Sequence, residues 1–255
     1  MSLTPEQTQR YARQIQLPEI GADGQARLAQ ASVLIAGLGG LGSAAAWYLA
    51  AAGVGRLGLL DSDRVEASNL QRQILHAAAD VGRPKTLSAA DKLRAFNPET
   101  ALDLLETRAT AENLPQLAAG YDFVIDATDN FPSKFLVSDV CVRLRKPFSH
   151  AGVSGFEGQT FTYLPGGQAG CYRCLFQSPP SPSGQAQDQS PAGILGTVAG
   201  SLGVIQATEA VKHLLGVGRL LTNRLLIYQA LEQRWREVAF RPAPDCPACK
   251  KMERG

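Results

Sequence analysis

Short apolar runs alternate with longer helix-forming segments along most of the chain. Runs such as residues 33–35 are typical of strands that are buried on both faces of a parallel sheet. Several of the segments between them are rich in Ala and Leu, which favour helices. Predicted strands cover residues 33–35, 56–60, 101–105, 123–127 and 147–153, and predicted helices cover residues 4–16, 23–30, 43–52, 84–95, 110–119, 131–144 and 194–215.

The pattern changes in the C-terminal part of the chain. Residues 157–164, 223–229 and 233–240 alternate in the way that antiparallel strands with one solvent-facing side do. The whole pattern predicts an α/β fold with a Rossmann-like doubly wound sheet, parallel in its N-terminal half and extended by antiparallel strands in its C-terminal half. A chain of 255 residues fits one such domain.

The turn after the first predicted strand carries Gly37, Gly39 and Gly42 at GxGxxG spacing, and the next strand ends at Asp61. Glycines let the backbone approach a phosphate, the following helix N-terminus offers free N–H groups, and an acid about 20 residues on can bind a ribose hydroxyl. The alternatives are a glycine-rich bend in an ordinary core and a membrane span, because residues 31–55 carry no charge. The glycines divide that run into pieces too short to span, so we predict nucleotide binding.

The residues after Asp61 extend this prediction. Asp63 comes two residues later. Arg72 and Lys85 then supply two cations that we expect near the phosphate end of the nucleotide. A triphosphate that must release pyrophosphate requires such fixed cations. The chain has no GxxxxGK[ST] sequence, which excludes a P-loop protein.

Net charge and cysteine content indicate which classes of partner and which cellular location to expect. A net charge of +2 is nearly balanced and indicates no nucleic-acid partner. The first residues lack the pattern of a secretory signal, so we expect a cytoplasmic, reducing location without a membrane. In that setting the five cysteines indicate metal binding or core packing rather than disulfides.

Four of the cysteines form two CxxC pairs, Cys171 with Cys174 and Cys246 with Cys249. Each pair offers two thiolates, and two pairs together suit a tetrahedral, structural zinc site that ties the C-terminal tail to the body. The alternative is a redox CxxC, but nothing here suggests a thioredoxin-like context. Cys141, inside a predicted helix, is expected to be a buried core thiol.

Several motifs together carry a resemblance to a known family. They are RYARQ (10–14), GLGGLG (37–42), LLDSD (59–63), SNLQRQ (68–73), VGRPK (81–85), DATDN (126–130) and the two CxxC pairs. Over nearly the whole chain the sequence resembles the MoeB/ThiF/HesA adenylyltransferases, relatives of the ubiquitin-activating enzymes. The resemblance implies a single adenylation domain over residues 1–255, with a nucleotide-binding half (1–150) and a carrier-binding, zinc-stapled half (151–255).

The resemblance also implies a reaction. ATP with Mg²⁺ would adenylylate the C-terminal glycine carboxylate of a small ubiquitin-like sulfur carrier ending Gly-Gly, MoaD- or ThiS-like, for molybdopterin or thiamin biosynthesis. Sulfur would come from a separate donor, a cysteine desulfurase or a rhodanese-type protein. Because a carboxylate is ionised at neutral pH, the enzyme needs no general base and works by positioning and charge neutralisation.

The resemblance assigns roles to individual residues. Arg13 would reach the nucleotide of the neighbouring subunit, which implies a homodimer, whereas the residues alone suggest a solvated basic face shared with Arg10. Asp129 would hold Mg²⁺, or else cap the next helix. Arg13, Arg72, Lys85 and Asp129 are expected to be catalytic. The nucleotide-binding residues are expected to be Gly37, Gly39, Gly40, Gly42, Asp61, Asp63, Ser68, Asn69, Leu70, Gln71, Arg72, Lys85, Asp129 and Asn130.

Residues 178–191 are polar and proline-rich, and we expect them to form a mobile crossover loop over the active site. Some relatives use a cysteine in this loop for thioester or persulfide chemistry. This chain has no cysteine between Cys174 and Cys246, and Ser190 stands near that place. The sequence therefore leaves open whether a covalent carrier thioester or a role for Ser190 exists, and adenylylation does not require either.

Three other functions are open to a chain of this pattern. A cyclic-threonylcarbamoyl-adenosine dehydratase shares the adenylation chemistry, an NAD-dependent oxidoreductase shares the glycine turn, and a scaffold could bind a carrier without catalysis. An oxidoreductase would need a His or a Tyr/Lys pair for hydride transfer, and this chain has no convincing candidate. Its histidines, His76, His150 and His213, form no useful spacing and are expected to play ordinary polar roles. A scaffold would not need the four expected catalytic residues.

Overall fold

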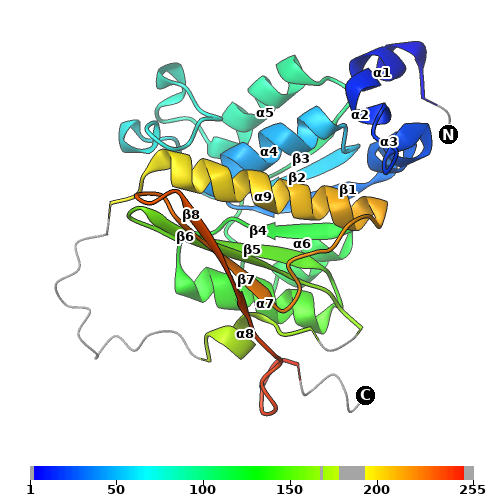
Figure 1. Ribbon diagram of the computed structural model, residues 1–255. Helices are drawn as coiled ribbons and strands as arrows, with labels where there is room; N and C mark the ends of the chain where they lie inside the picture. The colour runs from blue at the N-terminus through cyan, green and yellow to red at the C-terminus, as the bar shows by residue number, and fades with distance from the viewer. Residues whose placement is uncertain (1–2, 167–168, 178–192, 250–255) are drawn as a thin grey trace.

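Eight strands form one mixed sheet in the order β3-β2-β1-β4-β5-β6-β7-β8 (Figure 1). The computed structural model describes residues 3–166, 169–177 and 193–249. Neighbouring strands from β3 to β5 run parallel, and those from β5 to β8 run antiparallel. The structure thereby confirms the predicted division of the sheet into a parallel and an antiparallel half.

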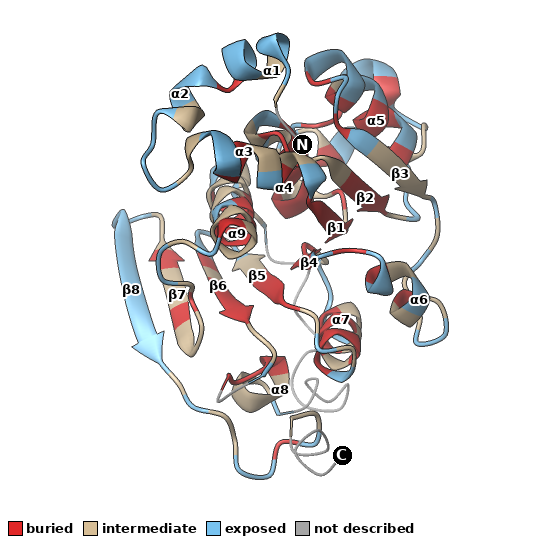
Figure 2. Ribbon diagram, turned by 90° about the vertical axis from the view of Figure 1, so that its right-hand side faces the viewer, coloured by how far each residue is buried: buried red, intermediate tan, exposed pale blue. Residues whose placement is uncertain are grey.

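Burial falls from the centre of the sheet to its last edge strand. The strands are β1 (Ser32–Ala36), β2 (Arg56–Leu60), β3 (Ala101–Leu105), β4 (Phe123–Asp126), β5 (Phe148–Ser154), β6 (Glu157–Tyr163), β7 (Arg224–Gln229) and β8 (Arg234–Ala239). Every residue of β1 is buried, whereas every residue of the edge strand β8 is exposed (Figure 2). Strand β1 is therefore covered on both faces, as its continuous apolar run predicts, whereas β8 alternates in sequence but has no buried residue.

Helices cover both faces of the parallel half. They are α1 (Pro5–Arg10), α2 (Ala12–Ile15), α3 (Gly21–Gln30), α4 (Gly40–Ala52), α5 (Lys85–Phe96), α6 (Leu114–Ala119), α7 (Phe131–Arg143), α8 (Tyr172–Leu175) and α9 (Gly196–Leu215), with short 3₁₀ helices η1 (Ala67–Asn69) and η2 (Ala78–Asp80). Val33 and Ile35 join a core with α4, α5 and α9, while Leu34 and Ala36 join a second core with α6 and α7. Alternate residues of one strand thus hold the helices on opposite faces.

Helix α9 lies directly against α4, the helix that follows the glycine turn. A Cβ atom on Gly203 would stand 2.2 Å from the carbonyl oxygen of Leu41, so the two backbones approach too closely for any side chain there. The long small-residue helix is therefore a core element, as the sequence predicts. It holds the first turn of α4 in place at the carboxyl edge of the sheet.

Two predicted helices differ from the observed ones. The helix expected over residues 4–16 breaks at Tyr11, whose ring is buried and whose hydroxyl accepts a 2.9 Å hydrogen bond from Asn97 Nδ2. The helix expected from Thr110 begins only at Leu114, because Thr110 and Asn113 bond to each other's backbone N–H in a preceding turn. The alternative of a membrane span at residues 31–55 is wrong: the segment divides into β1 and α4, and no helix of the described chain is long and apolar enough to cross a bilayer.

Candidate functional site

The glycine turn joins β1 to α4 at the carboxyl edge of the sheet. Gly37 has φ +97°, and a Cβ on it would lie 2.7 Å from the carbonyl oxygen of Ala127. A Cβ on Gly42 would lie 1.9 Å from the carbonyl oxygen of Gly37. Gly39 is the N-cap of α4, so the unpaired N–H groups of the helix begin at this turn. The predicted turn geometry is confirmed, and it can receive an anion.

Asp61 follows β2 and is tied to this turn. One carboxylate oxygen accepts a 2.7 Å hydrogen bond from the backbone N–H of Leu38, and the other accepts a 2.8 Å bond from that of Asp63. Burial raises the pKa of Asp61, while Lys85 and the two backbone donors oppose that rise. Besides the ribose role expected from sequence, Asp61 therefore fixes the loop.

Lys85 begins α5 and places a buried cation at the same edge. Its Nζ lies 2.9 Å from Asp63 Oδ2 and 3.9 Å from Asp61 Oδ2. The Lys85 side chain is only 7% exposed, whereas that of Asp63 is 66% exposed. The structure thus brings the three predicted residues together, with the ammonium group held between two carboxylates.

The segment around η1 lies over the first turn of α4. Arg72 Nη1 donates to the carbonyl of Ser68 at 3.1 Å, and Arg72 Cγ lies 3.4 Å from the place a Cβ on Gly40 would take. Asn69 is buried, and its Oδ1 accepts a 3.2 Å bond from the backbone N–H of Glu66. Arg72 is therefore beside the glycine turn, as predicted. Leu70 directly follows η1, and Gln71 Nε2 donates to the carbonyl of Ile194 at 3.5 Å.

Asp129 lies beyond the end of β4, with an exposed side chain. Its Oδ1 accepts a 3.2 Å hydrogen bond from Asn130 Nδ2. Asn130 is the N-cap of α7, because its Oδ1 accepts a 2.9 Å bond from the backbone N–H of Ser133. The alternative role of Asp129 as the helix cap is thus wrong, and its carboxylate faces solvent at the carboxyl edge of the sheet.

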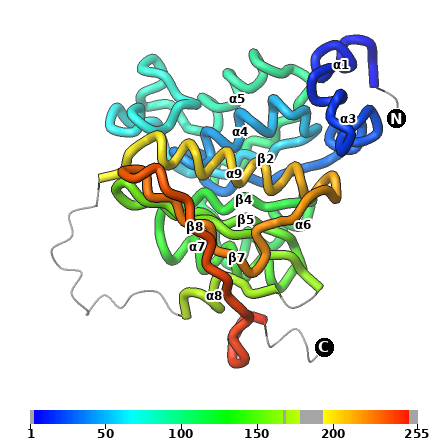
Figure 3. The backbone as a smooth tube through the Cα atoms, in the orientation of Figure 1, coloured from blue at the N-terminus to red at the C-terminus, as the bar shows by residue number. Residues whose placement is uncertain are grey.

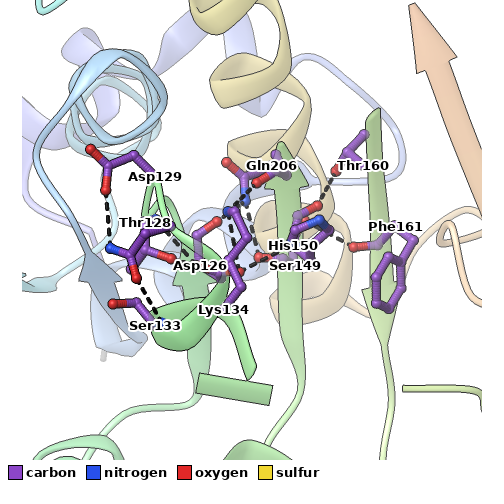
Figure 4. A network of polar contacts seen from close by, with 12 residues as sticks. Asp126, Thr128, Asp129, Ser133, Lys134, Ser149, His150, Thr160, Phe161 and Gln206 are labelled. Carbon is purple, nitrogen blue, oxygen red and sulfur yellow. Dashed lines mark hydrogen bonds and ion pairs between the residues drawn. The ribbon is translucent and has the colours of Figure 1, made fainter. Parts of the chain in front are cut away.

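A buried polar network that the sequence did not reveal supports the loop of Asp129 (Figure 4). Asp126 Oδ2 accepts a 2.9 Å hydrogen bond from His150 Nδ1 and lies 3.6 Å from Lys134 Nζ. Asp126 Oδ1 accepts bonds from the backbone N–H of Thr128 at 3.2 Å and from its hydroxyl at 2.6 Å. Lys134 Nζ also donates to the carbonyl of Ala151 at 2.6 Å. Strands β4 and β5 and helix α7 are thereby joined directly behind Asp129.

The ionisable groups of this network shift one another's pKa values. Burial alone would raise the pKa of Asp126, but Lys134 and the hydrogen bonds from His150 and Thr128 outweigh burial and lower it to about 2. Burial and the charge of Lys134 lower the pKa of His150 to about 4. At neutral pH Asp126 is therefore a carboxylate and His150 is neutral, while burial lowers the pKa of Lys134 and the charges of Asp126 and Asp129 oppose that fall. The hydrogen bond to Asp126 is the ordinary polar role that the sequence predicts for His150.

The four paired cysteines meet in one cluster. The Sγ–Sγ distances are 3.9 Å for Cys171 and Cys174, 3.6 Å for Cys171 and Cys246, and 3.8 Å for Cys174 and Cys249, and all four sulfurs lie within 4.8 Å of one another. Thiolates about 2.3 Å from a tetrahedral zinc lie roughly 3.8 Å apart, so the cluster fits this ion. Cys141 is buried in the core, as predicted, and burial raises the pKa of its thiol.

The cysteine cluster lies away from the glycine turn. Figure 3 shows the last described residues running from β8 past α8, on the side of the sheet opposite α4 and α5. Arg173, between the first two cysteines, makes two hydrogen bonds of 2.6 and 2.7 Å to Asp139 of α7. The cluster thus joins the C-terminal segment to α7, which is the stapling that the sequence predicts.

Arg13 is the one predicted catalytic residue that the structure does not bring to the glycine turn. It lies exposed on α2. Gln14 Nε2 donates to the carbonyl of Ala52 at 2.9 Å and Arg10 Nη1 to that of Phe96 at 3.2 Å, so α1 and α2 sit at the C-terminal ends of α4 and α5. The crossover segment 178–191, with Ser190, lies outside the described residues.

Known proteins are similar to this chain in sequence or in fold. The SAMP-activating enzyme E1 of Haloferax volcanii is 46% identical over 249 residues, which cover 98% of this chain and 91% of that protein. The sulfur carrier protein adenylyltransferase of Thermus thermophilus is 44% identical over 253 residues, which cover 98% and 93%. A crystal structure of E. coli MccB with ATP superposes with a TM-score of 0.82 at 25% identity, over 94% of this chain and 74% of MccB.

The family profile described as the ThiF family matches residues 11–248. That range includes the glycine turn, Asp61, Lys85, Asp129 and three of the four clustered cysteines. The match and the two close relatives agree with the resemblance that the motifs carry. The chain therefore belongs to the ThiF family.

Proposed function

We propose that this protein uses ATP to adenylylate the C-terminal glycine carboxylate of a small ubiquitin-like sulfur carrier protein. The observation that carries the proposal is the buried Lys85 ammonium beside Asp61, at the edge of the sheet where the glycine turn opens. A relative named sulfur carrier protein adenylyltransferase supports the substrate class, and a structural neighbour crystallised with ATP supports the nucleotide.

The residues of this edge divide the work of the reaction. A carrier carboxylate oxygen attacks the α-phosphorus of ATP, forming the acyl-adenylate and releasing pyrophosphate. Lys85 and Arg72 neutralise the charge that develops on the phosphates, and the N–H groups at Gly39 and Gly40 bind phosphate oxygens. Asp61 holds the ribose, and Asn69 faces the phosphates beside Arg72. No residue has to remove a proton, because the attacking carboxylate is already ionised.

Asp129 is suited to hold Mg²⁺ on the phosphates. Magnesium prefers carboxylate and phosphate oxygens and keeps several waters, so it needs an exposed carboxylate at the mouth of the site. Asp129 is exposed and is oriented by Asn130, while the Asp126 network fixes the loop on its other side. The ion would supply charge neutralisation for the departing pyrophosphate.

The position of Arg13 supports a homodimer with shared sites. Helix α4 has 13 residues, so about 20 Å separate the glycine turn at its start from α2 at its end. An arginine side chain on α2 cannot span that distance within one chain. We therefore assign Arg13 to the nucleotide of the partner subunit.

The four-cysteine cluster would hold a structural zinc ion. Four thiolates complete the tetrahedral shell and leave no position for water or substrate. Since the cluster joins α8, α7 and the C-terminal segment, the ion stabilises the half that receives the carrier. Sulfur for the activated carrier then comes from a separate donor, a cysteine desulfurase or rhodanese-type protein.

ATP–pyrophosphate exchange with purified carriers tests the function. MoaD-like and ThiS-like carriers are each compared with a version lacking the terminal glycine. Exchange that requires the terminal glycine is the expected result, and the better carrier identifies a molybdopterin or a thiamin pathway. Tight ATP binding without exchange for any carrier would contradict the proposal and leave a carrier-binding scaffold.

A further inference from the structure

Both peptide groups of Leu38, inside the glycine turn, are anchored by buried side chains. The backbone N–H of Leu38 donates to Asp61 Oδ2 at 2.7 Å. On its other side, the carbonyl oxygen of Leu38 lies 3.1 Å from His76 Nε2. His76 is 7% exposed and lies on the core side of the turn. The proposed adenylylation chemistry gives it no role.

The surrounding hydrogen bonds decide which nitrogen of His76 carries the proton. His76 Nδ1 lies 2.9 Å from Ser88 Oγ, and Ser88 Oγ accepts a 3.0 Å bond from Lys92 Nζ. The carbonyl oxygen of Leu38 can only accept and an ammonium group can only donate, so a neutral ring satisfies both of its contacts when Nε2 carries the hydrogen and Nδ1 accepts from the Ser88 hydroxyl. Nε2 therefore carries the hydrogen and donates to the carbonyl of Leu38. Burial, with Lys85 and Lys92 nearby, lowers the pKa of His76 and keeps the ring neutral.

The chain of hydrogen bonds from Lys92 through Ser88 and His76 to the Leu38 carbonyl, here called the relay, fixes the direction of the N–H group of Gly39. In a trans peptide the C=O and the following N–H point in opposite directions. With the Leu38 carbonyl held toward His76, the N–H of Gly39 must point away from the core, at the N-cap of α4. A flipped peptide would instead present a carbonyl oxygen to the phosphates, and a glycine offers little steric resistance to such a flip.

We propose that His76 is a positioning residue for the phosphate-binding turn, set in its donor tautomer by Ser88 and Lys92. The inference rests on the proposed nucleotide site and adds a residue to it. Lys85, Ser88 and Lys92 are spaced at i, i+3 and i+7 on α5, so one face of this helix carries both the phosphate cation and the relay that orients the turn. Asp80 in turn holds Lys92 through an ion pair.

The test compares phosphate-dependent and phosphate-independent binding. Dissociation constants for ATP and for adenosine are measured by calorimetry on the full chain, as wild type, His76→Phe and His76→Gln. Phenylalanine keeps the ring volume without the donor, and we expect about a tenfold loss of ATP affinity with less than about a twofold change for adenosine. Glutamine restores an N–H donor at nearly the same place, so His76→Gln should recover most of the ATP affinity.

Two results would overturn the assignment: ATP affinity unchanged in His76→Phe, or ATP and adenosine weakened to the same extent. Should His76→Phe fail to fold, Ser88→Ala provides the second variant, because it removes the hydrogen bond that sets the tautomer. It should weaken ATP but not adenosine, and unchanged ATP affinity would contradict the relay. No carrier takes part, so a chain that passes this test yet fails to adenylylate any carrier would refute the proposed function alone.

Discussion

Replacing Lys85 with methionine removes the cation of the proposed phosphate site and keeps the volume of its side chain. Two separate losses follow, one of catalysis and one of stability. For catalysis, Lys85 offers a preorganised, desolvated charge to the phosphates, and losing one such group costs about 10²–10³ in rate. ATP–pyrophosphate exchange should fall by that factor.

The structure also limits the stability loss. Removing one partner of a fully buried ion pair costs roughly 3–5 kcal/mol. Here the nearer partner, Asp63, is 66% exposed and can be solvated, while the buried Asp61 lies 3.9 Å away and keeps its two backbone donors. We therefore expect a loss of about 2 kcal/mol at neutral pH, carried mainly by Asp61.

The pH dependence of this loss identifies Asp61 as its source. Burial raises the pKa of Asp61 in the wild type, and Lys85 opposes the rise, so the pKa in Lys85→Met is higher still. A carboxyl group with a raised folded pKa favours folding when it is protonated. The deficit is therefore fully present above the folded pKa of Asp61 and shrinks as the pH falls through it.

Urea unfolding of wild type and Lys85→Met at neutral pH and at about pH 5 measures both quantities. Arg94→Met, which removes an exposed cation from the same helix, is the matched control and should match the wild type in exchange rate and stability. Near-normal exchange in Lys85→Met would refute the phosphate role. A deficit that stays constant or grows toward low pH would refute the role of Asp61.

Three further predictions concern other parts of the molecule. Arg13→Ala should abolish exchange without changing the melting temperature, and mixing it with Lys85→Met should restore part of the activity through mixed dimers; no restoration would contradict shared sites. Metal analysis should find one zinc ion per chain, and a strong chelator or Cys246→Ser should lower the melting temperature; a stable, zinc-free wild type would exclude the metal site. Burial lowers the pKa of His150 to about 4 from an ordinary 6.5, so the unfolded chain binds a proton that the folded chain does not; the full stability is present above about pH 6.5 and falls as the pH drops toward 4. Urea titrations should show a shallower loss over this range for His150→Asn than for wild type, and equal slopes would contradict the buried neutral state.

Local patterns in the sequence predicted the parts of the fold that local physics decides. The observed limits of β2 and β3 match the predicted limits residue for residue, because each is a mostly apolar run bounded by polar or turn residues. The glycine turn was predicted from spacing, since positive φ and close backbone contacts demand glycine there. The cysteine cluster followed from two short repeats, which leave little choice of ligand.

Tertiary contacts decided the features that the sequence did not reveal. Asp126, Lys134 and His150 come from β4, α7 and β5, and only the parallel pairing of those strands brings them together. Lys134 lies near the start of a helix, where a lysine is usually at the surface, so the sequence does not indicate that it is buried. The break at Tyr11 likewise depends on Asn97, which is distant in sequence. An aspartate that ends an apolar strand was the one available hint of the network.

Direct detection of the acyl-adenylate tests the central claim. We mix the wild-type protein with ATP, Mg²⁺ and a carrier ending Gly-Gly. The mass of the intact carrier is then measured by mass spectrometry before any sulfur donor is added. The account predicts a carrier heavier by one AMP less one water, absent when the terminal glycine is deleted and formed about 10²–10³ times more slowly with Lys85→Met. If the wild-type enzyme binds both ATP and the carrier but the mass of the carrier does not change, the claim that the enzyme adenylylates the carrier is contradicted.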